Sequence, residues 1–217
     1  KYISLNAPKS RLEEIKNIGK LMDKNAWTYK TYLENQATEE NIKKLNSPKI
    51  FHVATHGFFL EDISIDENSK EGIDSRNMKF NPLMRSGLLF AGAENTIREE
   101  DIPGNEDGIL TAYEAMNLNL DHTELVVMSA CETGLGEVKN GEGVYGLQRA
   151  FIVAGAQNLI MSLWKVNDET TQLLMSSFYE EWFSGKTKTE AFTSAIQNVK
   201  KKFNDPYYWG AFVMLGK

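Results

Sequence analysis

Two apolar runs of the sequence end on residues that can carry out nucleophilic catalysis. Residues 49–55 lead into His56 and Gly57, and residues 124–130 lead into Cys131. A cysteine thiol is mostly protonated at neutral pH, and an imidazole beside it can take the proton and leave the more reactive thiolate. If the two runs are neighbouring strands, His56 and Cys131 lie side by side, with His56 as the base and Cys131 as the nucleophile.

The backbone beside this pair offers hydrogen-bond donors for a developing negative charge. Gly57 suits a tight turn, and because it has no side chain its N–H can approach a substrate closely. The N–H groups of Gly57 and Cys131 are therefore the candidate oxyanion hole. The glycine-containing segment 132–136 follows the cysteine and can bring further backbone beside a ligand.

Each of these residues also has an ordinary structural interpretation. A single cysteine at the end of a strand is more often a small buried apolar residue than a nucleophile. His52 lies inside its run and is expected to pack in the core, while His122 lies in a polar turn and is expected to be solvated. The residue types alone leave the catalytic and the structural interpretations of His56 and Cys131 equally open.

The strands and helices that would position this pair follow from the periodicity of apolar residues. Residues 8–25 show helical spacing, with Ser10 able to cap the start, and Thr38 can cap a short helix. Residues 58–85 and 93–107 are long, polar and poorly periodic, and we expect them to be insertions around a site. Further patterns predict strands over 28–33, 86–91, 158–164 and 211–215, and helices over 110–116, 144–154, 168–184 and 188–203.

Three or four of the predicted strands are continuously apolar and alternate with helices. Strands of this kind are buried on both faces, unlike strands that alternate apolar and polar residues. The pattern predicts an α/β fold with a mostly parallel sheet and helices on both faces. Ligands of open α/β sheets bind outside the carboxyl ends of the strands, which is where His56 and Cys131 would lie.

Composition limits the classes of partner and environment. The 217 residues carry a net charge of -6, which argues against binding of nucleic acids or anionic membranes by this chain. The lysines at 200–202 are expected to be a solvated helix end. A single cysteine excludes an internal disulfide, and no apolar run approaches the ~18 residues that span a bilayer. No signal peptide is visible, so we expect a cytoplasmic domain, and the start at Lys1 suggests that it was cut from a longer protein.

Several motifs, in order along the chain, resemble one known family. Ala-Thr-His-Gly at 54–57 and Ser-Ala-Cys-Glu-Thr-Gly at 129–134 resemble the CHAT domain, a caspase-like family often fused to tetratricopeptide repeats. The resemblance covers roughly residues 11–217. The helix after the nucleophile, the next strand with its loop, and the closing strand also resemble the family, at 143–147, 150–156, 162–168 and 206–216.

The resemblance implies a fold, an activity and a setting. The fold is a caspase-like three-layer α/β sandwich, with residues 1–217 forming a single domain. The activity is hydrolysis of peptide bonds in a protein substrate by a dyad of His56 and Cys131, with no cofactor and no metal. The resemblance also implies a regulatory region upstream, such as repeats or a sensor, and some relatives serve bacterial defence and signalling. Direct nucleic-acid binding and membrane insertion are not expected of the domain.

Substrate preference is expected to depend on Ser129, Glu132 and Asp168, the candidate lining of the substrate pocket. In caspase relatives that cut after Arg or Lys, an acid often stands two positions before the nucleophile, and here that position is Ser129. A preference for basic side chains would therefore need charge from Glu132, Asp168 or a loop acid such as Asp107. The favoured interpretation of Asp168 is a cap at the start of the helix that follows.

Two kinds of ligand site are disfavoured by the sequence. Residues 141–146 match the dinucleotide-binding fingerprint, but about ten residues separate this motif from the preceding strand, and Glu142 would lie where phosphates must approach. The three histidines and one cysteine show no zinc-binding spacing.

The stronger alternative to an enzyme keeps the caspase-like fold without catalysis, as a binding or signalling scaffold. Its interface would use aromatic residues, for which the candidates are Trp164, Trp182, Tyr207, Tyr208 and Trp209.

Overall fold

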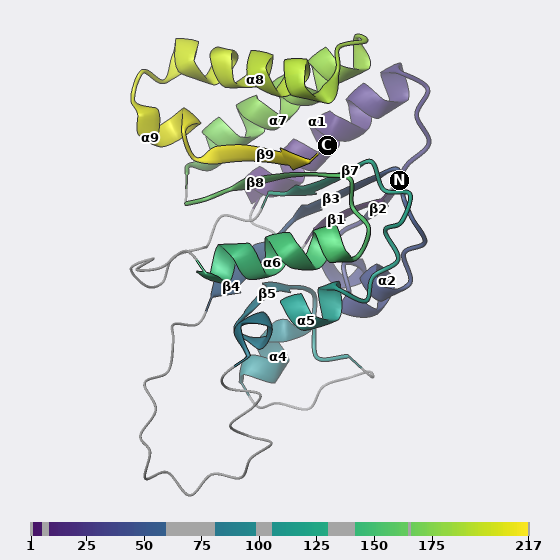
Figure 1. The fold of residues 1–217 in the computed structure, drawn as a ribbon. Coiled ribbons are helices and arrows are strands. Elements are labelled where there is room, and N and C mark those ends of the chain that lie inside the picture. The colour runs from purple at the N-terminus through teal and green to yellow at the C-terminus, as the bar shows by residue number, and fades with distance from the viewer. Residues whose placement is uncertain are drawn as a thin grey trace, which may run out of the picture.

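A six-stranded sheet forms the centre of the protein (Figure 1). The computed structural model describes residues 2–5, 9–59, 81–98, 106–129, 142–164 and 166–216. The strands lie in the spatial order β2 (Lys30–Tyr32), β1 (Tyr2–Leu5), β3 (Ile50–Ala54), β7 (Leu125–Met128), β8 (Asn158–Ser162) and β9 (Phe212–Gly216). In this spatial order, each strand from β2 through β7 pairs in parallel with the next strand, and β9 pairs antiparallel with β8. The mostly parallel sheet predicted from the sequence is confirmed.

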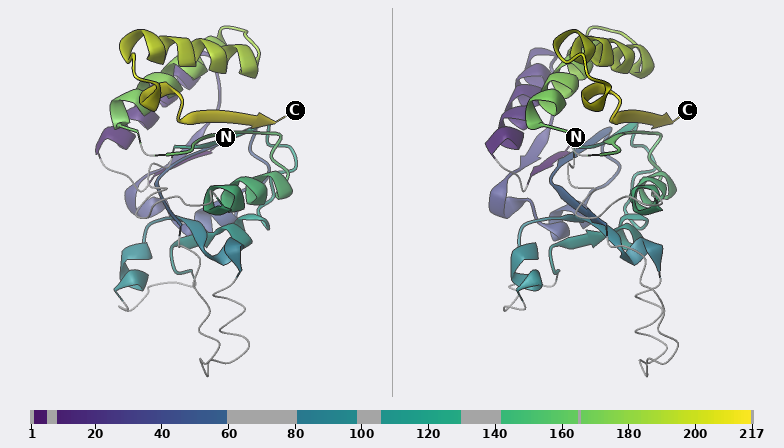
Figure 2. Two further views of the ribbon diagram at one scale, coloured as in Figure 1. Left: turned by 60° about the vertical axis from the view of Figure 1, so that its left-hand side comes forward. Right: turned by 90° about the vertical axis from the view of Figure 1, so that its left-hand side faces the viewer.

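Helices cover both faces of this sheet, so the fold has three layers (Figures 1 and 2). On one face α1 (Lys9–Lys24) and α7 (Asp168–Phe183) pack together, and α8 (Lys188–Lys202) packs on α7. On the other face lie α6 (Glu142–Val153) and the short α5 (Ala112–Ala115). Within the described segments, no helix has both the length and the apolar character needed to cross a membrane. The expected caspase-like α/β sandwich is confirmed.

Each central strand sends alternate side chains into two separate apolar cores. In β3, Phe51 and Val53 join the core shared with α6, whereas Ile50 and Ala54 join the core shared with α1, α7 and α8. Strands β7 and β8 divide their side chains between the same two cores. Burial of each large apolar side chain contributes about 1.5–3 kcal/mol. Because both faces are buried, the strands are continuously apolar in sequence.

Short elements account for most differences from the predicted elements. Strand β1 has four residues and is held by pairing with both β2 and β3, but no periodicity in the sequence marks it. Helix α9 (Pro206–Trp209) was also missed; its cap is Asp205, whose carboxylate accepts from the N–H of Tyr207. Helix α4 (Ala93–Ile97) occupies the start of segment 93–107, where the poor periodicity of the sequence did not predict a helix. Short 3-10 helices cover Glu34–Gln36 and Pro82–Met84.

Immediately after β3, the chain enters a second, smaller sheet. Strands β4 (His56–Phe59), β5 (Ser86–Leu89) and β6 (Ile109–Thr111) pair antiparallel in that order. The prediction of a polar insertion from residue 58 onward is wrong at its start, because Phe58 belongs to β4. Its ring packs over Gly87, where an added Cβ would lie 2.6 Å from Phe58 Cε1, so the glycine makes room for the aromatic side chain.

Candidate active site

The two strands predicted to lead into the reactive residues are neighbours. Strands β3 and β7 pair in parallel, with Ile50 opposite Leu125 and Val53 opposite Met128. Beyond β7, the N–H of Ser129 donates to the carbonyl of Val53 at 2.8 Å, so the pairing continues one residue further. The carboxyl ends of both strands therefore lie at the same edge of the sheet. The condition for the catalytic interpretation, that the two strands are neighbours, is therefore confirmed.

His56 is the first residue of β4, and its side chain is exposed. The buried Thr55 precedes it and donates its hydroxyl to the carbonyl of Leu89 in β5. His56 and Leu89 are also partners in the ladder between β4 and β5. The backbone that carries His56 is thus held by the main sheet on one side and by the second sheet on the other.

Cys131 and Glu132 lie outside the described residues. Ser129 is the last described residue before them. Gly57, the other predicted oxyanion donor, is buried and pairs with Leu88 in the second sheet. The catalytic roles of these residues stay predictions.

Ser129 belongs to a buried polar network, which we call the Glu14 network. The Ser129 hydroxyl donates to Glu14 Oε2 at 3.0 Å, and Glu14 Oε1 lies 3.0 Å from His52 Nε2. His52 Nδ1 lies 3.0 Å from the hydroxyl of Tyr179. None of the four residues is more than 2% exposed. The network joins α1, β3, the end of β7 and α7 through the interior of one core.

Burial affects the protonation of the Glu14 network. Burial, and after it the negative charge of Glu14, raise the pKa of the Tyr179 hydroxyl well above its ordinary value. The hydroxyl therefore keeps its proton. The tautomer of His52 sets which of its ring nitrogens donates: with the proton on Nε2, the ring donates to Glu14 and accepts from Tyr179. Both oxygens of the Glu14 carboxylate have a partner in the network.

The sequence predicted a packing role for one member of this network, and two members, Glu14 and Tyr179, were missed. His52 was expected to pack in the core, and it is fully buried, but it contributes two hydrogen bonds there. Glu14 was not singled out. A signal was present, because Glu14 lies four residues before the core residue Ile18 on an amphipathic helix. An acid on an apolar helix face needs a buried partner.

Asp168 is the first residue of α7, which follows β8 at the same edge of the sheet as the end of β7. Its side chain is half-buried. The cap of the helix is Asn167, whose Oδ1 accepts from the N–H of Thr170 at 2.8 Å. The prediction of Asp168 as the cap is therefore wrong by one residue. Asp168 instead adds negative charge to the first turn, which the helix dipole favours. Its role in a substrate pocket stays a prediction.

A second group of charged residues, which we call the Lys43 cluster, joins α2 (Glu39–Lys43) to the small sheet. Lys43 Nζ lies 2.7 Å from Glu39 Oε1, 2.6 Å from Glu106 Oε2 and 3.0 Å from Glu114 Oε1. Burial, opposed by Lys43, raises the pKa of Glu39 to about 7. Burial disfavours the charge of Lys43, but hydrogen bonds to the three carboxylates outweigh it and raise the pKa of Lys43. The carboxylate oxygens come within 4.8 Å of one another, as metal ligands do, but the ammonium already supplies their positive charge.

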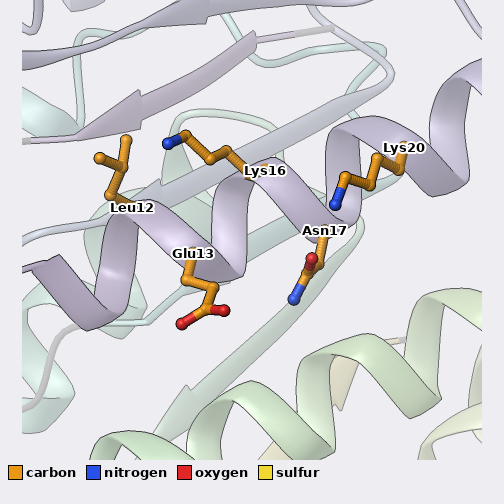
Figure 3. A pocket seen from close by; sticks show the side chains of 5 residues that line it. All are labelled: Leu12, Glu13, Lys16, Asn17 and Lys20. Atoms are coloured by element: carbon orange, nitrogen blue, oxygen red, sulfur yellow. The ribbon is translucent and has the colours of Figure 1, made fainter.

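A hollow lies on the surface of α1. It is lined by Leu12, Glu13, Lys16, Asn17 and Lys20, which all project from this one helix (Figure 3). The lining carries charges of both signs. Substrate clefts usually combine a largely apolar lining with a few converging polar groups. We therefore regard this hollow as part of the outer surface of α1 and not as the substrate pocket.

Comparisons with known proteins find relatives over most of the chain. Residues 2–217 match the CHAT domain. Tetratricopeptide repeat protein 28 of Mus musculus is 26% identical over 189 residues, which is 84% of this chain and 8% of that protein. Tetratricopeptide repeat protein 28 of Homo sapiens is 31% identical over 118 residues, which is 54% of this chain and 5% of that protein. The chain thus spans less than a tenth of the length of these relatives.

The family match extends far beyond the segments around His56 and Cys131. It includes the strands of the central sheet and the helices that cover both of its faces, and it agrees with the observed α/β sandwich. The relatives are named for tetratricopeptide repeats, the modules to which CHAT domains are often fused. The chain therefore belongs to the CHAT domain family, a caspase-like family related to proteases.

Proposed function

We propose that the chain is a cysteine endopeptidase that hydrolyses peptide bonds of a protein substrate with His56 and Cys131. The observation that carries the proposal is the parallel pairing of β3 with β7. This pairing brings the segments that lead into the two residues to the same edge of the sheet, where α/β proteins bind ligands. Membership of a caspase-like family supports the same function.

The proposed reaction divides hydrolysis into two steps. His56 takes the thiol proton as Cys131 Sγ attacks the carbonyl carbon, and the N–H groups of Gly57 and Cys131 donate to the oxyanion. His56 then gives the proton to the leaving amine, and a thioester remains on Cys131. Water attacks this thioester with His56 as the base, and the carboxylic acid and the free thiol are released.

The substrate and its control are part of the same proposal. We infer that the domain cuts a specific protein in the cytoplasm, in bacterial defence or signalling, under control of an upstream region in the same chain or complex. The matched segment is 8% or less of the relatives, which supports a role within a larger protein. Glu132 and Asp168 would line the pocket for the side chain before the cut, whereas Ser129 is buried in the Glu14 network.

The alternative is a scaffold that keeps the fold without catalysis. It is favoured by the names of the relatives, which describe a repeat and no enzymatic activity. Most of the aromatic residues suggested for its interface are partly buried against the core, namely Trp164, Trp182, Tyr208 and Trp209. Trp164 also donates its indole N–H to the carbonyl of Tyr207 at 2.9 Å. These side chains therefore contribute to packing, which weakens the argument for an aromatic interface.

Cleavage of a mixed peptide library by the purified chain, read by mass spectrometry, tests the proposal. We expect wild type to cut with a preference for one class of side chain before the cut. Cys131→Ala and His56→Ala should each lower the rate by at least ~10³-fold. His122→Ala is the matched control, because His122 is exposed and lies in a turn. Full cleavage by Cys131→Ala would exclude the thiol mechanism, and a wild type that binds a partner without cutting any peptide would favour the scaffold.

A further inference from the structure

The Glu14 network adjoins both segments that lead into the proposed dyad. Ser129 precedes Cys131 by two residues, and His52 precedes His56 by four residues. Ser129 and His52 both bond to the same carboxylate, one to each oxygen. The network therefore connects the middle of β3 and the end of β7 to each other and to α1.

Stability alone is a weak reason for a carboxylate at this position. The network lies in the core shared by α1, α7 and the sheet, among apolar neighbours such as Ile15, Ile18 and Phe178. Removing a carboxylate from water is costly even when hydrogen bonds compensate it, and apolar residues of similar volume often stabilise a core equally well or better. Contacts between apolar side chains have no preferred direction, whereas hydrogen bonds do. The hydrogen bonds of Glu14 fix the positions of their partners, so the network points to a requirement for geometry.

The end of β7 is restrained twice at Ser129. Its N–H donates to the carbonyl of Val53 at 2.8 Å, and its hydroxyl donates to Glu14 Oε2 at 3.0 Å. The first bond sets the distance between β3 and β7, and the second sets the distance from β7 to α1. Ser129 is 2% exposed, so water cannot replace the second bond if it is lost.

We propose that Glu14 and Ser129 are positioning residues of the dyad, with the Glu14 carboxylate bridging the two strands so that the thiol of Cys131 and the imidazole of His56 meet at reactive distance. This inference rests on the proposed function. A nucleophile and its base must approach to about 2.6–3.2 Å, and a displacement of about 1 Å can lower a rate by about 100-fold. A looser end of β7 is therefore enough to weaken catalysis while the fold persists.

The single cysteine of the chain gives a direct measurement of this geometry. Alkylation by iodoacetamide requires the thiolate, so the ratio of the alkylation rates at pH 7 and pH 9 reports how well a neighbouring base activates Cys131. We expect wild type to react nearly as fast at pH 7 as at pH 9. His56→Ala should lower the ratio by about 10-fold, because an isolated thiol is largely protonated at pH 7.

Ser129→Ala and Glu14→Gln are the test variants. Each should lower the alkylation ratio at least ~3-fold and lower kcat for a cleaved library peptide by about 10-fold to 100-fold, with little change in KM. Glu13→Gln is the matched control, because Glu13 is the exposed neighbour of Glu14 on α1 and should match wild type. Circular dichroism verifies folding at the assay temperature. If Glu14→Gln does not fold, Ser129→Ala, which removes one oxygen atom, decides.

Three results would overturn the inference, and they differ from one another. Folded variants with the wild-type alkylation ratio and kcat would show that the dyad needs no such support. A change confined to KM, or to the side chain preferred before the cut, would assign Ser129 to the substrate pocket. Equal pH dependence of alkylation in wild type and His56→Ala would show that the proposed dyad itself does not exist.

Discussion

Two groups of polar side chains hold this domain together in different ways. The Glu14 network is buried under the main sheet, where one carboxylate bonds to an imidazole and a hydroxyl. The Lys43 cluster lies at the second sheet, where one ammonium contacts three carboxylates and the lysine side chain is 29% exposed. The first group relies on bonds with fixed directions. The second relies on charges whose surroundings include water.

This difference determines what each group tolerates. In the interior, removal of one hydrogen-bonding group leaves its partner unsatisfied, and no water replaces it. Near the surface, solvent compensates most of a lost ion pair, which is worth little. We therefore expect the Glu14 network to respond to the loss of single atoms, and the Lys43 cluster to respond mainly to pH.

Glu14→Ala should give the largest loss of stability. It removes both acceptors at once and leaves the hydrogen-bonding groups of His52 and Ser129 without this partner in the core. We expect the free energy of unfolding, measured with urea, to fall by about 3 kcal/mol. Glu13→Ala, one residue away on the exposed face of α1, should change it by less than about 0.5 kcal/mol. Equal losses in the two variants would mean that the network is dispensable.

Tyr179→Phe should give an intermediate loss of stability, because it removes a single hydroxyl at the far end of the network. We expect a loss of about 1–2 kcal/mol at pH 7. The raised pKa of Tyr179 means that the folded state holds this proton more tightly than the unfolded chain does. Its contribution to stability is therefore complete below pH 10 and falls as the pH rises further.

Urea unfolding of Tyr179→Phe between pH 9 and pH 11 separates this contribution from simple packing. Wild type should lose stability more steeply than the variant as the pH rises, because the variant has no hydroxyl to ionise at this position. Tyr113→Phe, at a residue that is 50% exposed, should follow the wild-type curve. Parallel curves for wild type and Tyr179→Phe would contradict the raised pKa of Tyr179.

The main sheet could be predicted because its signals are local. Continuous apolar runs identify β3, β7 and β8 without knowledge of their neighbours, and the position of His56 after its run is a property of the sequence alone. That β3 and β7 are adjacent depends on tertiary pairing and could only be stated as a condition. The start of α7 shows a smaller failure: Asn167 and Asp168 are both good caps, and their order in the chain does not decide between them.

The two polar groups could not be predicted because their contacts are not local. The hydrogen bonds of the Glu14 network join residues 38, 115 and 127 positions apart. In the Lys43 cluster only the pair of Glu39 and Lys43 has helical spacing, while Glu106 and Glu114 come from 63 and 71 positions away. No periodicity rule connects such positions, so the residues that complete each group emerge only from the fold.

Glu39→Gln should give the smallest effect, and its sign depends on pH. Burial raises the pKa of Glu39 from its ordinary value of 4.5 to about 7, so at intermediate pH the folded state binds a proton that the unfolded chain has released. The stability that comes from this group is complete below pH 4.5 and falls as the pH rises to about 7. Glutamine cannot ionise, so the stability of the variant relative to wild type should increase across this window, by less than about 1 kcal/mol.

Urea midpoints across this pH window measure the change, with Glu40→Gln as the neighbouring control. A hydrogen bond from Lys44, and then its charge, lower the pKa of Glu40, so any contribution from Glu40 is present above its ordinary value and is lost as the pH falls. The two variants should therefore shift in opposite directions, with the exposed Glu40 giving the weaker shift. If the difference in urea midpoint between Glu39→Gln and wild type does not change with pH, water screens the Lys43 cluster as fully as it screens the exposed pair of Lys44 and Glu40.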